Sequence, residues 1–99
     1  MTTYIGFLRK HGDGTYTVAF PDLPGCTTVG ENLALVSAQA GDDLVRHLTA
    51  LMSFGYPAPA ASTEAQLATD TRRGSAELMA FDVDMDLLGI ANPLTYHTL

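Results

Sequence analysis

Apolar and polar residues alternate along the first 30 positions in a way that predicts short β-strands. Strands are expected at residues 4–10 and 15–20. One face of the second strand would carry its large side chains, Tyr16, Val18 and Phe20. Residues 11–14, between the two strands, read HGDG, and glycine and aspartate tolerate the positive φ of tight turns. The two strands are therefore expected to form an antiparallel hairpin.

A segment with two prolines, FPDLPGC at residues 20–26, follows the hairpin. Pro21 ends the second strand because proline has no N–H to donate to the ladder. Pro24 and Gly25 suit the two central positions of a type II turn, where proline presets φ and glycine supplies a positive φ. A short third strand is expected at residues 26–29.

Residues 33–54 have the three- and four-residue apolar spacing of an amphipathic helix that packs on one face. The expected buried stripe is Leu33, Val36, Ala40, Leu44, Leu48 and Leu51. Asn32 is a suitable N-cap, Gly55 is a suitable C-terminal cap, and the prolines that follow prevent the helix from continuing. Gly41, inside the helix, is interpreted either as a close-packing position or as a weak point.

The residues after these prolines predict a second helix and a fourth strand. A short helix is expected within residues 60–70, with Ser62 or Thr63 as its cap. From Ser75 the period returns to two, which predicts a strand with one solvated face. Its buried face would carry Met79, Phe81, Val83 and Met85, and its solvated face Asp82, Asp84 and Asp86.

The expected fold is α+β with the element order β-β-β-α-(α)-β. A three-stranded antiparallel sheet, a returning edge strand and one long helix on one face would form two layers. Residues 1–86 are expected to form one α+β domain, and residues 87–99 a short C-terminal tail. Gly89 and Pro93 interrupt this tail, which is expected to be irregular or to form a single helical turn.

Length and composition restrict the class of protein. With 99 residues, 46% of them hydrophobic, the chain is long enough for one domain and too apolar for disorder. No run approaches the about 18 apolar residues of a membrane span, and the first residues lack a signal-peptide pattern. A cytoplasmic protein without membrane association is therefore expected. The single cysteine, Cys26, excludes an intrachain disulfide.

The balance of acidic and basic residues indicates what kind of partner the chain can bind. Five Lys and Arg against eleven Asp and Glu give a net charge of −6. Nucleic-acid binding draws most of its affinity from cations that neutralise phosphates, and five Lys and Arg are too few to form a good nucleic-acid-binding surface. An acidic protein suits a basic partner, because complementary fields speed their encounter. Solvation alone explains the net charge equally well.

The hairpin, the FPDLPGC segment, the short strand, Gly30 and the amphipathic helix that ends in residues 55–57 together resemble the HicB family of antitoxins. The resemblance covers about residues 3–60, and extends more loosely to the strand near residues 77–84. It implies a partial RNase H-like fold and the inhibition of a small basic ribonuclease toxin of the HicA family. It also implies a homodimer or a homotetramer.

Two departures from the family pattern qualify this resemblance. Many HicB-like proteins append a helix-turn-helix or ribbon-helix-helix domain, which needs roughly 40 or more residues. Only thirteen residues follow Asp86, so no direct DNA binding is expected from this chain. RNase H enzymes hold metal ions with acidic residues, one of them on the first strand. Residues 4–10 contain no acid, so the likeness of fold implies no nuclease activity.

The most conspicuous group of acids is Asp82-x-Asp84-x-Asp86. On one strand face, their carboxylates would lie about 6–7 Å apart. They could bind a metal ion, face a basic partner, or be a solvated edge that protects the sheet from aggregation. An EF-hand loop is excluded, because Leu87 stands where that loop needs glycine and Pro93 where it needs glutamate.

Two further sites have both a structural and a functional interpretation. Asp22, in the exposed turn after the hairpin, either belongs to a rigid connection or touches the partner. Cys26 with His11 or His47 could form a nucleophile and base, but a small side chain at the start of a strand is expected to pack in the core. No catalytic, cofactor-binding or metal-binding residue is expected. The candidate partner-binding residues are Asp22, Asp82, Asp84 and Asp86.

Three hypotheses about function follow from the sequence. The first is an antitoxin of a type II toxin–antitoxin system that binds and masks a HicA-type toxin. The second is an orphan HicB-like module that only self-associates, as a structural or regulatory subunit. The third is a small hydrolase or nuclease, although nothing in the sequence demands an enzyme.

Overall fold

The computed structural model describes residues 1–88 and 94–99. Its first third contains the three predicted strands, β1 (Thr2–Lys10), β2 (Tyr16–Ala19) and β3 (Thr27–Gly30). They are antiparallel neighbours in the order β3-β2-β1. The turn between β1 and β2 is closed by the His11 N–H, which donates to the Thr15 carbonyl at 2.8 Å. The predicted hairpin is confirmed.

The loop between β2 and β3 contains the predicted type II turn. The Cys26 N–H donates to the Leu23 carbonyl at 3.0 Å, and Gly25 has a φ of +87°. The Leu23 N–H in turn donates to the Phe20 carbonyl at 3.1 Å. These bonds point the Leu23 side chain into the core, where it is fully buried.

α1 (Leu33–Ser53) begins and ends as the sequence predicted. The Asn32 side chain accepts a backbone N–H of the first turn at 2.9 Å. At the other end Gly55, with a φ of +80°, stops the helix, and the Tyr56 N–H donates to the Leu51 carbonyl at 3.0 Å. This is the glycine-dependent Schellman arrangement, which satisfies carbonyls that the helix leaves unpaired.

The middle of the predicted apolar stripe is buried, and its ends are not. The buried members are Val36, Ala40, Leu44 and Leu48. Leu33, at the first position of the helix, is 44% exposed, and Leu51 is half-buried. Gly41 is a close-packing position, because a Cβ there would overlap the side chain of Leu94.

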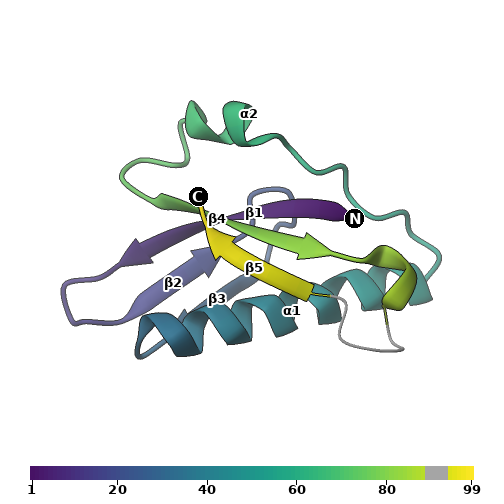
Figure 1. Ribbon diagram of the computed structural model, residues 1–99, viewed down its shortest axis with the longest axis horizontal. Coiled ribbons are helices and arrows are strands. Elements are labelled where there is room, and N and C mark those ends of the chain that lie inside the picture. The colour runs from purple at the N-terminus through teal and green to yellow at the C-terminus, as the bar shows by residue number, and fades with distance from the viewer. Residues whose placement is uncertain (89–93) are drawn as a thin grey trace.

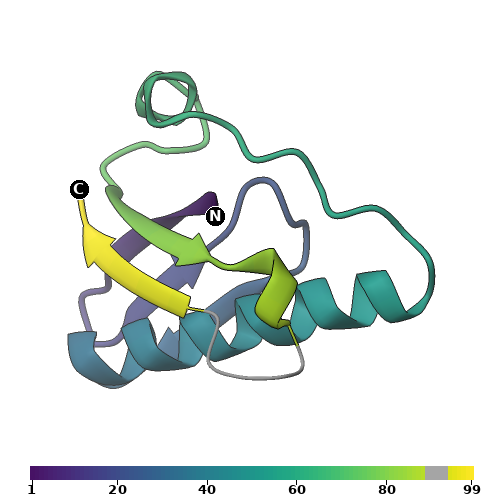
Figure 2. The same ribbon diagram turned by 45° about the vertical axis from the view of Figure 1, so that its right-hand side comes forward.

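The last two strands complete one antiparallel sheet in the order β3-β2-β1-β4-β5. β4 (Glu77–Val83) returns beside β1, with Tyr4 opposite Phe81. β5 (Leu94–Thr98) pairs with the other side of β4, so β4 is internal and not the edge strand that the sequence predicted. The α+β class, the antiparallel sheet and the long helix on one face are confirmed (Figures 1 and 2).

The expectation of an irregular C-terminal tail is wrong for Leu94–Thr98. A single helical turn does occur, but earlier, as η1 (Met85–Leu87). The sequence obscured β5 because three of its five residues are threonine or histidine, whose polarity hides the alternation of a half-exposed strand. Gly89 and Pro93, which interrupt the tail, lie outside the described residues.

The sheet is covered on both faces, as Figure 1 shows, with α1 below it and α2 above. The larger core lies between α1 and the sheet, and the smaller one beneath α2 (Glu64–Ala68) and the turn that follows. The smaller core consists of Ile5, Phe7, Leu67, Ala76 and Leu78. The prediction that β4 has a solvated second face is therefore wrong for Leu78 and Ala80, which are buried.

α2 begins with the cap that the sequence predicted. The Thr63 hydroxyl accepts the Gln66 N–H at 3.2 Å, and the Gln66 side chain accepts the Thr63 N–H at 2.9 Å. This reciprocal capping box stabilises a helix of only five residues. Within the described part of the chain, no helix is long and apolar enough to cross a membrane.

Candidate partner-binding surface

The sheet places three of the four predicted acidic residues, Asp82, Asp84 and Asp86, toward one end of the molecule. Thr2 lies opposite Val83, so β1 begins where β4 ends. β2 ends farther along the sheet, where Ala19 lies opposite Phe7, and Asp22 lies in the loop that follows. The four candidates lie on β4 or in the segments that follow β2 and β4: Asp22, Asp82, Asp84 and Asp86.

Asp22 binds another part of the same chain. Its carboxylate accepts the Ser62 backbone N–H at 2.7 Å and the Ser62 hydroxyl at 2.6 Å. Nearby, the Tyr4 hydroxyl donates to the Pro59 carbonyl at 2.6 Å. Burial raises the pKa of Tyr4, and the charge of Asp22 raises it further. Asp22 therefore ties the loop between β2 and β3 to the connection between α1 and α2.

Asp82, Asp84 and Asp86 do not share a strand face, so that prediction is wrong. β4 ends at Val83, and the chain turns into η1. Asp84 is the N-cap of this turn and accepts the Asp86 N–H at 3.1 Å, while Asp86 is exposed. Alternation continues past Val83 in the sequence, but the capping preference of aspartate ends the strand.

Asp82 remains on β4 and faces the side of the sheet that α2 partly covers. Its carboxylate accepts the Thr3 hydroxyl at 2.6 Å, across the β1–β4 pair. The other carboxylate oxygen lies 3.9 Å from Nδ1 of His97, on β5. About a quarter of the Asp82 side chain is exposed, at 27%.

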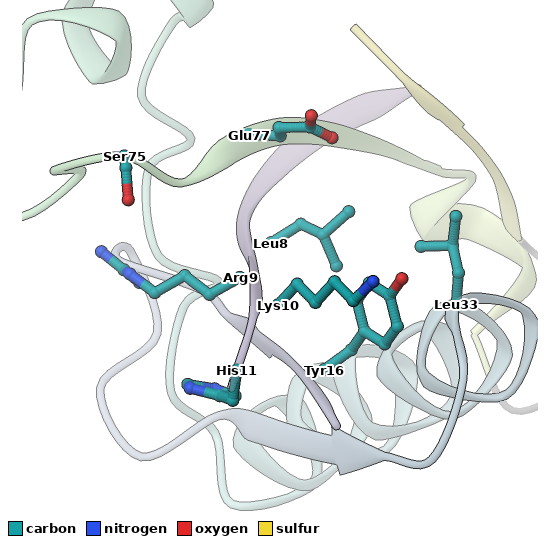
Figure 3. Close-up of a pocket in the computed structure, with 8 residues that line it drawn as sticks. All are labelled: Leu8, Arg9, Lys10, His11, Tyr16, Leu33, Ser75 and Glu77. Carbon is teal, nitrogen blue, oxygen red and sulfur yellow. The ribbon is translucent and has the colours of Figure 1, made fainter. Parts of the chain in front are cut away.

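Cations gather at the opposite end of the sheet, where β1 ends. A cavity of about 410 Å³ lies there, and Figure 3 shows Arg9, Lys10 and His11 around it. The Arg9 guanidinium donates to the carbonyls of Arg72 and Arg73 at 2.6 and 2.8 Å. The Lys10 ammonium lies 5.9 Å from the centre of the Tyr16 ring. At this end of the sheet, Arg9 holds the turn that follows α2 through main-chain bonds.

Cys26 packs in the core, as its structural interpretation predicted. Burial raises the pKa of its thiol to about 11, and the charge of Asp43 adds to this. A thiol that keeps its proton near neutral pH is a weak nucleophile. A hollow on the surface beside Cys26 is also lined by His47. His11 lies elsewhere, at the end of the sheet where Arg9 and Lys10 gather. Among residues 1–88 and 94–99, no group of three His, Cys, Asp or Glu could hold a metal ion.

The sequence did not reveal the surface around β5. The large side chain at its centre, Tyr96, is 40% exposed, and its ring centre lies 5.5 Å from that of Phe81. A hollow flanks the strand on each face of the sheet. The one available signal was the run LTYHT after a proline, which is rich in β-branched and aromatic residues.

Comparisons with known proteins agree with the fold. The family model described as the HicB-like antitoxin of bacterial toxin–antitoxin systems matches residues 4–92. The chain is similar in structure to the N-terminal domain of the Burkholderia pseudomallei antitoxin HicB, with a TM-score of 0.77 and 22% identity over 85% of this chain and 100% of that one. For the structure of the whole B. pseudomallei antitoxin HicB the TM-score is 0.81, with 23% identity over 92% of this chain and 70% of that one.

A third solved structure is described as the HicA3 and HicB3 toxin–antitoxin complex. A chain in it is 29% identical to this one, with a TM-score of 0.64, over 78% of this chain and 92% of that chain. No curated protein matches the chain.

Proposed function

The chain belongs to the HicB-like antitoxin family of bacterial toxin–antitoxin systems, and on this premise we propose that it binds and masks a small basic HicA-type ribonuclease toxin. A ribonuclease binds RNA through cations that neutralise phosphates, so its substrate-binding face is positive. An acidic protein that covers this face excludes RNA both sterically and electrostatically. The proposal places the chain in the cytoplasm, where its partner meets RNA.

The observation that carries the proposal is the acidic character of the chain and of the end of β4. The net charge is −6, and Asp82, Asp84 and Asp86 lie at the end of β4. At the other end of the sheet, Arg9 and Lys10 lie among acids, because Glu77 is opposite Leu8 and Asp13 is in the adjoining turn. A basic partner is therefore drawn toward the acidic end.

The four predicted acids differ in what they can offer a partner. Asp86 is exposed and Asp84 is half-buried, and both lie in the η1 turn. Asp22 accepts two hydrogen bonds from Ser62 and Asp82 accepts one from Thr3, whereas Asp84 accepts a backbone N–H of its own turn. In the proposed complex, Asp84 and Asp86 therefore contribute most at the end of β4, and Asp22 contributes least.

The proposal assigns the chain a protein partner and no direct contact with DNA. Arg9 donates to main-chain carbonyls, Arg72 pairs with Asp70 at 2.7 Å, and Arg46 pairs with Asp43 at 3.3 Å. Cations already committed in this way form a poor phosphate-binding surface. An electrophoretic shift of the chain's own promoter DNA by the purified chain would contradict this part.

The test is neutralisation of a HicA-type ribonuclease toxin, sought among the small basic proteins encoded next to this chain's gene. Co-expression is expected to restore growth, and the purified chain to stop RNA cleavage at equimolar ratio. A double variant, Asp84→Asn with Asp86→Asn, should weaken binding by about three- to tenfold, because exposed ion pairs are modest in strength. Asparagine keeps the cap of η1.

The matched control removes two charges elsewhere on the surface, Glu31→Gln with Asp42→Asn. Both residues are exposed and lie in or next to α1. It should change the dissociation constant by less than about twofold, because unpaired surface charges far from an interface act only through the screened field. A toxin that cleaves RNA unhindered in the presence of excess chain contradicts the proposal.

A self-associating module without a toxin is the alternative. The feature that favours it is the composition of the two edge strands: neither β3 (Thr27–Gly30) nor β5 contains a charged residue or a proline. Light scattering that shows a stable homodimer or homotetramer, with no toxin neutralised, would support this alternative over the antitoxin.

A further inference from the structure

We infer that the outer edge of β5 is the docking site for an extended segment of the basic partner. Alternate side chains of this segment, apolar on one side and Lys or Arg on the other, would enter the two hollows that flank the strand. The inference rests on the proposed function for the basic character of the partner, and it adds the surface and the chemistry of recognition.

The main-chain groups of β5 are oriented for pairing with an added strand. The Leu99 N–H donates to the Leu78 carbonyl of the β4 side at 3.1 Å. Because these groups alternate in direction along an antiparallel strand, the N–H and C=O of Tyr96 and Thr98 point away from β4. β5 is the last strand of the sheet, and strand addition at such an edge is a common mode of peptide recognition.

Among the residues that the structure describes, the edge of β5 also lacks the usual protection against strand pairing. Natural edge strands commonly carry lysine, proline, a bulge or an inward-pointing charge. The sequence of β5, LTYHT, contains neither lysine nor proline. Its register with β4 runs without interruption from Val83 opposite Leu94 to Met79 opposite Thr98.

The hollow on the α1 face of the sheet suits an apolar side chain. It has a volume of about 430 Å³ and lies between the first turns of α1 and β5. Met79 lines it as a buried residue, with Leu33 and Tyr96 beside it, 44% and 40% exposed. A leucine or valine placed here would cover the exposed parts of Leu33 and Tyr96.

The hollow on the α2 face suits a cationic side chain. Its volume is about 370 Å³, and Ile5, Ala61 and Ala80 give it apolar walls. The carboxylates of Asp82 and Glu64 also line it. Lysine and arginine have an aliphatic stem and a charged head, so the stem would lie on the apolar walls and the head would reach the carboxylates.

The two hollows match the geometry of a single added strand. Side chains of a β-strand point alternately to the two faces of the sheet. On β5 itself, Tyr96 and Thr98 line the α1-side hollow and Leu99 lines the α2-side hollow, while His97, between them, borders both. A neighbouring strand in register would therefore send successive side chains into the two hollows in turn.

A second copy of this chain fits the same edge less well. Antiparallel pairing of two β5 strands would offer the α2-side hollow only Thr95, His97 and Leu99, none of them lysine or arginine. It would also bring the Asp82 and Glu64 carboxylates of the two copies toward each other, in chains that each carry a net charge of −6. The charge of the hollow thus favours a basic segment.

The test uses two synthetic peptides and the whole chain labelled with ¹⁵N. One peptide alternates lysine and valine over seven residues, and the other alternates glutamate and valine. We expect the lysine peptide to shift the amide signals of Tyr96, Thr98 and their β4 neighbours, and the glutamate peptide to shift none of them. Signals of β3, at the other edge, should stay unchanged.

Two proline variants form a matched pair for the main-chain contacts. Thr98→Pro removes an N–H that points outward from β5, without removing a bond to β4. Val29→Pro is the equivalent change on β3. The Phe20 N–H donates to the Cys26 carbonyl, so by the alternation of an antiparallel strand the Val29 N–H points away from β2. Thr98→Pro should weaken peptide binding by about tenfold, and Val29→Pro by less than about twofold.

A second pair tests the charged hollow without disturbing the strand. Asp82→Asn with Glu64→Gln should weaken binding of the lysine peptide by about tenfold, and Asp13→Asn with Asp42→Asn, whose side chains line neither hollow, by less than about twofold. Asparagine at 82 can still accept the Thr3 hydroxyl, so the sheet is expected to remain intact. The ¹⁵N spectrum of each variant reports directly on its fold.

Any one of these peptide results overturns the inference: no binding of the lysine peptide, equal binding of the glutamate peptide, shifts centred on β3, or a Thr98→Pro variant that binds like the parent. Light scattering that shows two copies joined through β5, with dissociation in Thr98→Pro, also overturns it. The proposed function is judged separately. If the parent chain neutralises the toxin and Thr98→Pro does so equally well, the docking site is wrong and the antitoxin role stands. If no toxin is neutralised, the antitoxin role fails, whatever the peptides do.

Discussion

Gly30, the last residue of β3, lies in close contact with the first turn of α1. A Cβ on this residue would lie 2.8 Å from the Val36 Cβ, and 2.9 Å from both its Cα and its backbone nitrogen. Ordinary contacts of a methyl carbon begin near 3.4 Å. Gly30→Ala therefore requires β3 and the first turn of α1 to move apart by several tenths of an ångström, because the neighbour is backbone and cannot rotate away.

The expected net effect combines two terms of opposite sign. Overpacking of this kind costs about 1–3 kcal/mol. Replacing glycine by alanine also restricts the unfolded chain, which stabilises the folded state by about 0.4–1 kcal/mol. We therefore expect Gly30→Ala to lower the free energy of unfolding by about 1–2 kcal/mol.

Urea denaturation followed by far-UV circular dichroism measures this difference. Gly12→Ala is the matched control, because nothing lies within 4 Å of a Cβ at Gly12 and its φ is not positive. Gly12→Ala should leave stability unchanged or raise it by up to about 1 kcal/mol. If Gly30→Ala is as stable as Gly12→Ala, then β3 and α1 are not in the close contact described above, and the reasoning is refuted.

Three further predictions concern titratable side chains. Iodoacetamide should alkylate Cys26 of the native chain at pH 8 far more slowly than in urea, because the thiol pKa is raised to about 11; equal rates would contradict this. The pKa of Asp70 is lowered to about 2 by hydrogen bonds from Arg72, so the stabilisation it provides is complete above the ordinary carboxyl pKa and is lost as pH falls toward 2. Asp70→Asn should flatten the acid side of the stability profile, and an unchanged profile would show that the pair is not formed. Asp22→Ala should destabilise the chain by about 1.5–3 kcal/mol and speed hydrogen exchange at the Ser62 amide, since it removes two bonds to a carboxylate; Asp22→Asn, which keeps an acceptor, should lose less.

The features that the sequence predicted well are those that depend on a few neighbouring residues. Asn32 caps α1, Pro24 and Gly25 form a turn, and Gly55 ends the helix, each through contacts within five positions along the chain. The buried stripe of α1 follows from the helical period alone. These features can be predicted from the sequence because the hydrogen bonds that form them join residues close together in the chain.

The candidate site depended on contacts between distant residues. Asp22 lies in an exposed-looking turn, but Ser62, forty positions away, binds it. The spacing of Asp82 and Asp84 in the sequence is that of two residues on one face of a strand. In the structure, however, Val83 is the last residue of β4, and Asp84 caps the next turn. No local pattern distinguishes a strand that continues from one that ends in a cap.

The sequence by itself determined the hairpin, the long helix and the acidic charge, because turn chemistry, periodicity and composition are properties of the chain at short range. Only the tertiary structure decided that β5 lies outside β4, that α2 covers the second face and that two hollows flank β5. Strand order and the shape of a surface arise when segments far apart in sequence pack together, and the energy of that packing depends on which faces meet.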